Sequence, residues 1–212
     1  EEVLNQFHIE TSTNLEDKID SQNIKVSIIG KPNAGKSTFF NSLIKENRSI
    51  VSPKAGTTRD AISKSIVFKN DKIELFDTAG LRKKSKIDQT IESFSVSKAI
   101  SSMRTSSGVL YLVDGKENIT YQDLHLISLI ISSGKPLIIG INKSDKLSQY
   151  DKSNITRSIN KKLAFISGIS IHYISAKQNK GTSKVFKELI NLIKKSVKKI
   201  DTSKLNDLVE EA

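Results

Sequence analysis

Residues 30–37, with the sequence GKPNAGKS, have the residue types and spacing of a loop that binds phosphate groups. The run follows an apolar stretch and precedes apolar residues at helical spacing, which is the context that such a loop needs. Its glycines let the backbone curl so that N–H groups point at phosphate oxygens, and the following helix adds the positive end of its dipole. We expect Lys36 to bridge the terminal phosphates and Ser37 to bind Mg²⁺. The expected phosphate contacts are Gly30, Lys31, Pro32, Asn33, Ala34, Gly35, Lys36, Ser37 and Thr38.

A second motif, NKSD at residues 142–145, determines which base such a loop would serve. A phosphate-binding loop alone fits ATPases, kinases and GTPases. The carboxylate of Asp145 can accept two hydrogen bonds, which matches the N1–H and N2–H₂ donors of guanine, whereas adenine has an unprotonated N1. Backbone N–H groups at residues 175–177 would lie near guanine O6. The sequence therefore predicts GTP and GDP as ligands, held at the base by Asn142, Lys143, Ser144, Asp145, Ser175, Ala176 and Lys177.

Two further segments are placed where a γ-phosphate would be sensed. Asp77 is expected to hold Mg²⁺ through water, while the Gly80 N–H contacts the γ-phosphate. In the run GTTRD at 56–60, we assign to Thr58 the hydroxyl that reaches Mg²⁺ when the γ-phosphate is present, with Thr57 as the second choice. Loops that close on the γ-phosphate and relax after hydrolysis make a conformational switch. The expected contacts in the second segment are Asp77, Thr78, Ala79, Gly80 and Leu81.

Hydrolysis by such a site would be slow without help. Position 81 is a leucine where Ras-like enzymes carry the glutamine that orients the attacking water, and a leucine side chain cannot hydrogen-bond to water. Catalysis would then come from Lys36, Mg²⁺ and backbone N–H groups such as that of Gly80, which stabilise charge on the phosphates.

The elements that must position these residues alternate between strand and helix patterns. Most of the alternation predicts a parallel sheet covered on both faces, the three-layer α/β/α fold of a P-loop NTPase. Two runs meet at a tight Asn70-Asp71 turn and predict an antiparallel hairpin, which gives one antiparallel edge strand. The six strands are expected at 24–29, 62–68, 72–76, 108–113, 136–141 and 169–174, and the helices at 36–45, 87–102, 121–132, 154–165 and 183–197.

The chain has 212 residues, of which 36% are hydrophobic, enough for one well-packed domain. We place this domain at 24–199, after a polar leader or linker at 1–23. Residues 200–212 begin a further helix that belongs to another domain. The longest apolar stretches are much shorter than the roughly 20 residues that span a bilayer, so no membrane-spanning segment is expected.

Lys and Arg exceed Asp and Glu by 34 to 23, which gives a net charge of +11. A polyanionic partner such as RNA or a ribosomal surface fits this charge through counterion release. Lysines that are only solvated, or a biased genome, fit it as well. The lysines cluster toward the carboxyl end, which favours a binding face, and the run RKK at 82–84 allows the same two interpretations.

With these motifs in order, the chain resembles the branch of GTPases that includes Era, Der and the tRNA-modifying MnmE. The runs GTTRD at 56–60, DTAGLRKK at 77–84, IESFSV at 91–96 and QDL at 122–124 are similar to the second GTPase domain of the Der family. The resemblance covers 24–199 and implies a cytoplasmic bacterial protein that acts in large-subunit assembly and contacts rRNA. It also implies an upstream GTPase domain, joined through 1–23, and a downstream KH-like domain that begins at 200–212.

The resemblance further implies K⁺ as an extra positive charge in hydrolysis, with Asn33 as the residue that contacts it; a purely structural role for Asn33 in the loop is the alternative. Two features depart from the family: only one GTPase domain is present, and Ser144 stands where Der proteins usually have tryptophan. Two other functions stay open. They are the GTPase module of a tRNA-modification enzyme, and a nucleotide-binding scaffold with negligible turnover.

Overall fold

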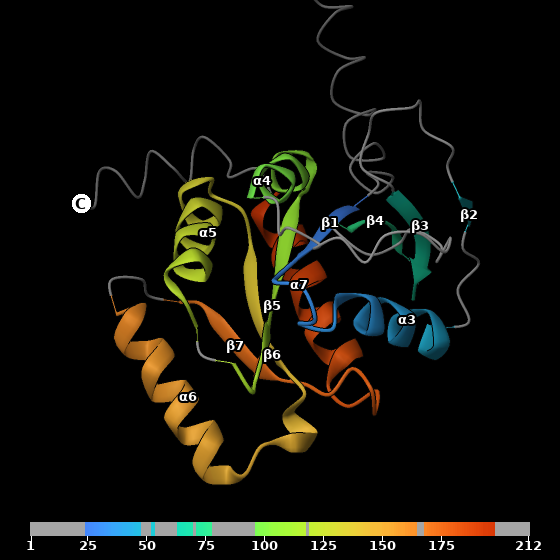
Figure 1. Cartoon of the computed structure of the whole chain (residues 1–212). Coiled ribbons are helices and arrows are strands. Elements are labelled where there is room, and N and C mark those ends of the chain that lie inside the picture. Colours follow the sequence, from blue (N-terminus) through green and yellow to red (C-terminus); the bar gives the residue numbers. More distant parts are fainter. Residues whose placement is uncertain are drawn as a thin grey trace, which may run out of the picture.

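A computed structural model of the chain has a central β-sheet with helices on both faces (Figure 1). The sheet has seven strands in the order β2-β3-β4-β1-β5-β6-β7. The structure describes residues 24–47, 52–53, 63–69, 71–77, 96–117, 119–164 and 168–197. The strands are β1 (Ile24–Ile29), β2 (Ser52–Pro53), β3 (Ser63–Phe68), β4 (Asp71–Asp77), β5 (Gly108–Asp114), β6 (Leu137–Asn142) and β7 (Ser170–Tyr173).

The six strands expected from the sequence all form. β1 lies parallel to both β4 and β5, and β6 and β7 continue the parallel part of the sheet. β3 is antiparallel to β4, as predicted for the hairpin. The seventh strand, β2, was not expected: it pairs antiparallel with β3 and takes the edge position assigned to β3. A two-residue strand is too short to show the period-2 alternation by which strands are recognised.

The hairpin turn lies one residue earlier than the sequence predicted. Phe68 of β3 pairs with Asp71 of β4, so Asp71 belongs to the strand and not to the turn. Lys69 has a φ of 56°, the left-handed conformation that two-residue hairpin loops require. The turn therefore ends before Asp71, because this residue is already paired with Phe68 of β3.

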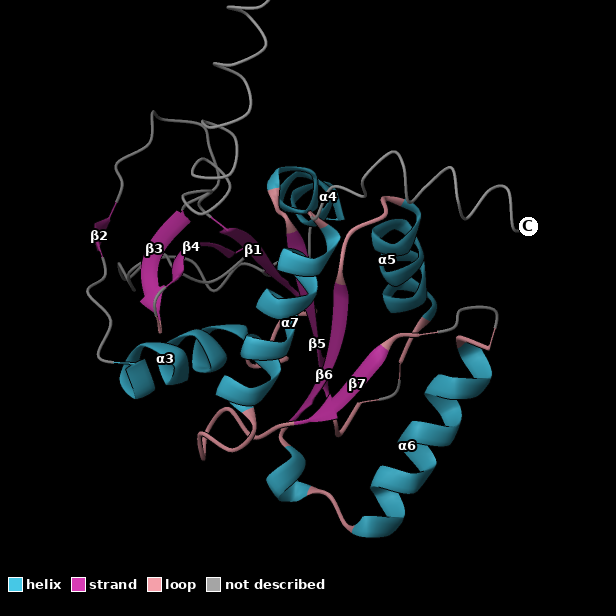
Figure 2. Cartoon of the chain, turned by 180° about the vertical axis from the view of Figure 1, so that it is seen from behind, coloured by secondary structure: helices cyan, strands magenta, loops and turns pink. Residues whose placement is uncertain are grey.

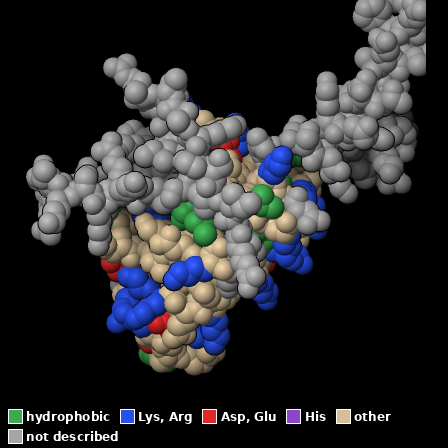
Figure 3. Space-filling view, turned by 90° about the vertical axis from the view of Figure 1, so that its right-hand side faces the viewer, with side chains coloured by type: hydrophobic (Ala, Val, Ile, Leu, Met, Phe, Trp, Pro, Cys, Tyr) green, Lys and Arg blue, Asp and Glu red, His purple; other side chains and the backbone are tan. Residues whose placement is uncertain are grey.

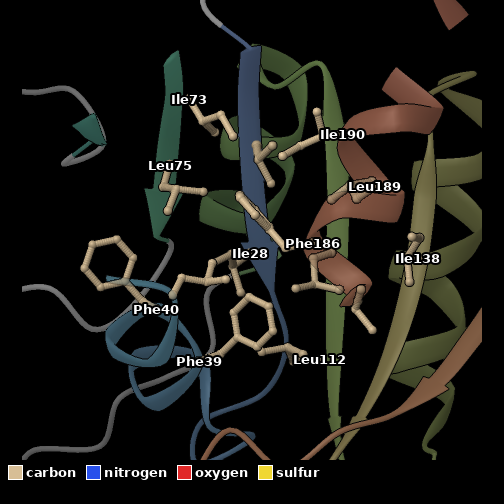
Figure 4. Close-up of a cluster of buried hydrophobic side chains, with 14 of the residues drawn as sticks. Ile28, Phe39, Phe40, Ile73, Leu75, Leu112, Ile138, Phe186, Leu189 and Ile190 are labelled. Atoms are coloured by element: carbon tan, nitrogen blue, oxygen red, sulfur yellow. The ribbon is translucent and has the colours of Figure 1, made fainter. Parts of the chain in front are cut away.

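Each face of the sheet has its own hydrophobic core, because the central strands are buried on both sides. In β5, Leu110 and Leu112 point to the face covered by α3 (Lys36–Asn47) and α7 (Thr182–Ser196). Figure 4 shows Leu112 there with Phe39 and Phe186. The rings of Phe68 and Phe186 meet edge to face, with centroids 4.9 Å apart. Such near-continuous apolar strands are typical of parallel sheets between helices.

The other helices that the structure describes lie on the opposite face of the sheet, and Figure 2 shows the molecule from behind. Val109, Tyr111 and Val113 of β5 point to this side. The helices are α4 (Val96–Thr105), α5 (Tyr121–Ser132) and α6 (Gln149–Lys162), and a short 3₁₀ helix, η1 (Ser144–Lys146), precedes α6.

The helix bounds lie within three residues of the sequence prediction except at the starts of α6 and α4. α6 begins at Gln149 rather than at 154 and ends at Lys162 rather than at 165. Ser148 caps it: the Asp151 N–H donates to Ser148 Oγ over 3.1 Å, and the Asp151 carboxylate accepts from the Ser148 N–H over 2.9 Å. This reciprocal pair starts the helix six residues before its first aliphatic residue, Ile155. The predicted start of α4 at 87 lies outside the described residues.

The expected leader at 1–23 and the carboxyl-terminal segment at 200–212 also lie outside the described residues, so the proposed domain bounds stay predictions. Among the residues that the structure describes, no helix has the length and apolarity to cross a membrane.

Candidate functional site

The sequence motifs meet at one edge of the sheet. β1, β4, β5, β6 and β7 run parallel, so their carboxyl ends share this edge, where ligands bind in open α/β folds. The loop at 30–35 follows β1, the NKSD motif begins at the last residue of β6, and Ser175 follows β7 closely. Asp77 ends β4 in register with Ile28, two residues before the loop. The structure thus brings together the first three groups and the backbone of Asp77.

Most residues of the two segments expected to sense the γ-phosphate lie outside the described part of the chain. Thr58, with GTTRD at 56–60, lies outside the described residues, and the same holds for Thr78, Ala79, Gly80 and Leu81. The roles expected for these residues remain predictions, as does the role of the Asp77 side chain.

Two glycines allow the phosphate-type loop to pass close to its neighbours. A Cβ at Gly30 would lie 2.2 Å from the carbonyl oxygen of Leu112, and a Cβ at Gly35 would lie 2.0 Å from Asn142 Nδ2. Gly35 also has a φ of 93°, which L-residues with side chains rarely adopt. No other residue type fits either position without a shift of β5 or of the Asn142 side chain.

Lys36 opens α3 and folds back over the loop that precedes it. Its ammonium donates to the carbonyl oxygens of Gly30 and Lys31 at 2.9 and 2.7 Å. The side chain is buried, which is rare for a lysine that lacks specific partners. Around it the loop winds through Asn33, which has a φ of 62° and is exposed. A positive charge is therefore held against the concave side of the loop.

The amide of Asn142 joins the loop to the base motif. Its Nδ2 donates to the Ala34 carbonyl oxygen at 2.8 Å, and its Oδ1 accepts from the Ala176 N–H at 3.0 Å. Asn142 is buried, so both bonds are shielded from water. Three segments far apart in the sequence are held by one side chain. The sequence predicted that Asn142 contacts the guanine base. It did not predict that Asn142 connects these segments, because the motif does not show which segments lie beside it in the fold.

Asp145 is exposed at the start of η1, next to the segment 175–177. Its Oδ1 accepts a hydrogen bond from Ser175 Oγ at 2.6 Å. This bond lowers the pKa of Asp145 below its ordinary value, so the group is an anion at neutral pH. Lys143 precedes it with a φ of 62°, and its ammonium pairs with the buried carboxylate of Asp114 at the end of β5. Two contacts therefore hold the segment around the Asp145 carboxylate: the hydrogen bond from Ser175 and the ion pair of Lys143 with Asp114.

A buried carboxylate that sequence reasoning did not assign lies behind the loop. Asp123 of α5 accepts hydrogen bonds from Lys31 Nζ at 2.8 Å, from the N–H and hydroxyl of Thr120 at 2.8 and 2.7 Å, and from the Tyr111 hydroxyl at 2.8 Å. Burial alone would raise the pKa of Asp123, but these bonds lower it below its ordinary value. Burial and the neighbouring anion raise the pKa of Tyr111.

We call Lys31, Asp123, Tyr111 and Thr120 the Asp123 network. It connects the first turn of the phosphate-type loop with the amino end of α5. The sequence contained one signal for it, since Thr120 and Asp123 have the spacing of a capping box. Its link to Lys31 depends on the fold.

A glycine-rich loop between a strand and a helix, tied to an Asn-Lys-x-Asp motif at the carboxyl edge of a mostly parallel sheet, defines a P-loop GTPase domain. The 50S ribosome-binding GTPase family matches this chain over residues 25–143, and the chain belongs to that family.

Relatives and solved structures agree with this assignment and with the resemblance found in the sequence. GTPase Der from Buchnera aphidicola is 43% identical over 190 residues, which are 90% of this chain and 41% of that protein. The chain therefore spans about two fifths of the length of this relative. Era from Aquifex aeolicus bound to GDP and AlF₄⁻ is 31% identical, with a TM-score of 0.56 over 84% of this chain and 57% of that chain. Era in complex with MgGDPNP and a segment of 16S ribosomal RNA is 32% identical, with a TM-score of 0.56 and the same two coverages.

Proposed function

We propose that the chain binds GTP and GDP and hydrolyses GTP as a switch that acts on the large ribosomal subunit. The observation that carries this proposal is the Asn142 bridge, because it ties the loop for the phosphates to the segment at 175–177, where Ser175 bonds the carboxylate for the base. A ligand that spans both must carry a guanine and a polyphosphate. The GTP contacts are those predicted from the sequence, from Gly30 to Thr38, Asp77 to Leu81, Asn142 to Asp145 and Ser175 to Lys177.

Selection of guanine rests on the charge of Asp145. As an anion, this carboxylate offers only acceptors, so it complements the two adjacent donors of guanine and is left unpaired by adenine. The hydrogen bond from Ser175 supports the proposal in two ways, since it favours the ionised form and orients the carboxylate.

The residues at the loop fit Mg²⁺. Ser37 is exposed in the first turn of α3, and the backbone of Asp77 ends β4 in register with β1, which leads into the loop. Hydroxyl and carboxylate oxygens are ligands that Mg²⁺ prefers. Thr58 would add a third oxygen, and Asp77 would act through water. When bound, Mg²⁺ neutralises charge on the β- and γ-phosphates.

Hydrolysis depends on groups of the chain that stabilise negative charge. Lys36 already holds its ammonium over the loop, where it would move from carbonyl oxygens to the terminal phosphates. The Gly80 N–H would bond the γ-phosphate, and Thr58 would close over it. Leu81 cannot orient water, so the rate without further help should be slow.

Asn33 is the proposed contact for K⁺, as the resemblance to the Der family implies, and it is exposed in the phosphate loop. We expect GTP turnover in K⁺ to exceed turnover in Na⁺ at matched ionic strength, and Asn33→Ala to abolish the difference while leaving GTP affinity within about threefold, or about 0.7 kcal/mol. Equal rates in the two salts would contradict the role of K⁺ and leave GTP binding untouched.

The ribosomal role rests on the family. The chain belongs to the family of 50S ribosome-binding GTPases, and its net charge of +11 suits an RNA partner. Under this proposal the protein is cytoplasmic, with an upstream GTPase domain joined through 1–23 and a KH-like domain from 200. Co-sedimentation with purified large subunits in the presence of a non-hydrolysable GTP analogue, and less with GDP, tests it. Equal binding in both nucleotide states would contradict the switch.

A further inference from the structure

A hollow with a basic lining lies beside α6, away from the phosphate-type loop. It has a volume of about 660 Å³ and is open to solvent between α6 and β7. Figures 1 and 2 both place α6 next to β7, the last strand at this edge of the sheet. α6 contributes residues spaced three and four apart, which form one face of the helix. We call this hollow the α6–β7 groove.

The charge of the groove has one sign. Lys152, Arg157 and Lys161 line it, and no carboxylate and no aliphatic side chain does so among the residues that the structure describes. The rest of its lining consists of hydroxyl and amide side chains and Tyr173. None of the three cations takes part in the ion pairs found within the described part of the chain. The acid nearest in sequence, Asp151, is used in the cap of α6.

Tyr173 gives the groove a fixed aromatic wall. Its hydroxyl donates to the Lys152 carbonyl oxygen at 2.7 Å and lies 2.8 Å from Thr156 Oγ1. The Lys152 ammonium lies over the ring, 6.0 Å from its centroid. A ring held at its far end on α6 cannot turn away, so the groove keeps its shape when a ligand enters.

We propose that the α6–β7 groove binds the phosphate backbone of RNA. From Lys152 to Lys161 the helix rises about 14 Å, which matches the axial rise of about four nucleotides of one duplex strand. Cations neutralise phosphates, while hydroxyl and amide groups suit phosphate and ribose oxygens. The buried cores of protein interfaces are depleted of charged residues, whereas this lining has three charged side chains, no aliphatic one and a single aromatic one, Tyr173.

The concave shape of the groove supports the proposal more strongly than its positive charge does. Lys and Arg side chains also gather on the side of the molecule shown in Figure 3, so positive charge is not confined to α6. At the groove, charge coincides with a concave surface and an aromatic wall. The inference rests on the proposed ribosomal function, which it deepens by giving RNA a place to bind. In the sequence, α6 starts three residues after η1, which contains Asp145.

The test is the salt dependence of RNA binding by the full chain loaded with a GTP analogue. The variant Lys152→Gln/Arg157→Gln/Lys161→Gln is compared with Lys184→Gln/Lys187→Gln/Lys195→Gln, which removes the same charge from exposed positions of α7. With a uridine dodecamer as probe, removal of three phosphate contacts should lower the slope of log affinity against log salt by about 2. We expect at least about tenfold weaker binding near physiological salt for the α6 variant, and little change for the α7 variant. GTP turnover without RNA should be unchanged in both.

Several outcomes would overturn the proposal. Wild-type protein that does not bind the dodecamer, an unchanged slope in the α6 variant, or an equal loss in the α7 variant would each exclude the groove as the RNA site. A variant that binds RNA normally but no longer co-sediments with large subunits would show that the groove takes a protein. Conversely, if the α6 variant alone loses RNA while wild-type protein fails to bind subunits in any nucleotide state, the groove stands and the ribosomal role fails.

Discussion

One amide side chain, that of Asn142, holds together the parts of the candidate nucleotide site that come from β1, β6 and β7. It is buried, and each of its two polar atoms has a backbone partner. The geometry of the phosphate-type loop therefore depends on Asn142, although this residue belongs to the motif that is expected to bind the base. The sequence motif predicted the type of residue and its approximate place, but the pairing with Ala34 and Ala176 needs the folded sheet, since the partners lie 108 and 34 residues away.

Asn142→Ala should weaken both folding and nucleotide binding. The substitution leaves a buried N–H and a buried C=O without partners, which costs about 2–4 kcal/mol of the free energy of unfolding. Urea denaturation measures this loss, and calorimetry should show weaker binding of both GTP and GDP. The control is Asn191→Ala at an exposed position of α7, where the same change should stay within about 0.5 kcal/mol. Equal losses at the two positions would contradict the bridge.

The Asp123 network predicts a pH dependence of stability. Its hydrogen bonds lower the pKa of Asp123, so the stability it adds is fully present above the ordinary carboxyl value near 4 and is lost as the pH falls through the lower folded value. The difference in free energy of unfolding between wild type and Asp123→Asn should therefore be constant near neutral pH and shrink below about pH 4. A double-mutant cycle with Lys31→Gln measures the ion pair itself. A difference that stays constant down to acid pH would argue against an ionised Asp123.

At the scale of elements, the spacing of apolar residues predicted the strands and most helix bounds. This spacing arises because the strands and helices bury their apolar residues on one or both faces of the sheet. The three corrections have local causes. β2 has only two residues, the hairpin turn is decided by the pairing of Phe68 with Asp71, and α6 begins with a polar turn that only its cap explains. Hydrophobic spacing carries no information about any of these three features.

The cap of α6 predicts a local loss in stability. Ser148→Ala removes the oxygen that accepts from the Asp151 N–H and should cost about 1 kcal/mol. Amide hydrogen exchange in the first turn of α6 should speed up most. Ser153→Ala serves as the control, because its hydroxyl only bonds the Gln149 carbonyl oxygen within the helix, so its removal should be neutral or slightly stabilising. The same exchange rates in both variants would show that the helix does not depend on its cap.

For the whole molecule, the sheet couples two cores that share its central strands. Figure 4 shows that the helices of the loop side, α3 and α7, meet over β1 and β5 through Phe39 and Phe186. A change in this core should therefore reach the candidate site, since α3 begins at Lys36.

Phe186→Ala tests the core on this face of the sheet. Truncation of a fully buried ring that packs against Phe39 and Phe68 should cost about 3–5 kcal/mol in the free energy of unfolding. Tyr150→Ala, at an exposed position of α6, should stay within about 0.5 kcal/mol. Denaturation followed by far-ultraviolet circular dichroism gives both values. A loss below 1 kcal/mol, on the scale of ordinary surface changes, would contradict the core described for this face.

The proposed function depends most on selection of guanine by a carboxylate held next to a phosphate loop. Isothermal titration of the chain in Mg²⁺ with GTP, ATP and xanthosine triphosphate tests it directly, together with the variant Asp145→Asn. We expect GTP to bind at least about 100-fold more tightly than ATP. The variant should reverse the preference toward the xanthine nucleotide, because an amide N–H can pair with the carbonyl oxygen that replaces the guanine amine. Equal affinity for GTP and ATP, or an unchanged preference in the variant, would contradict the account.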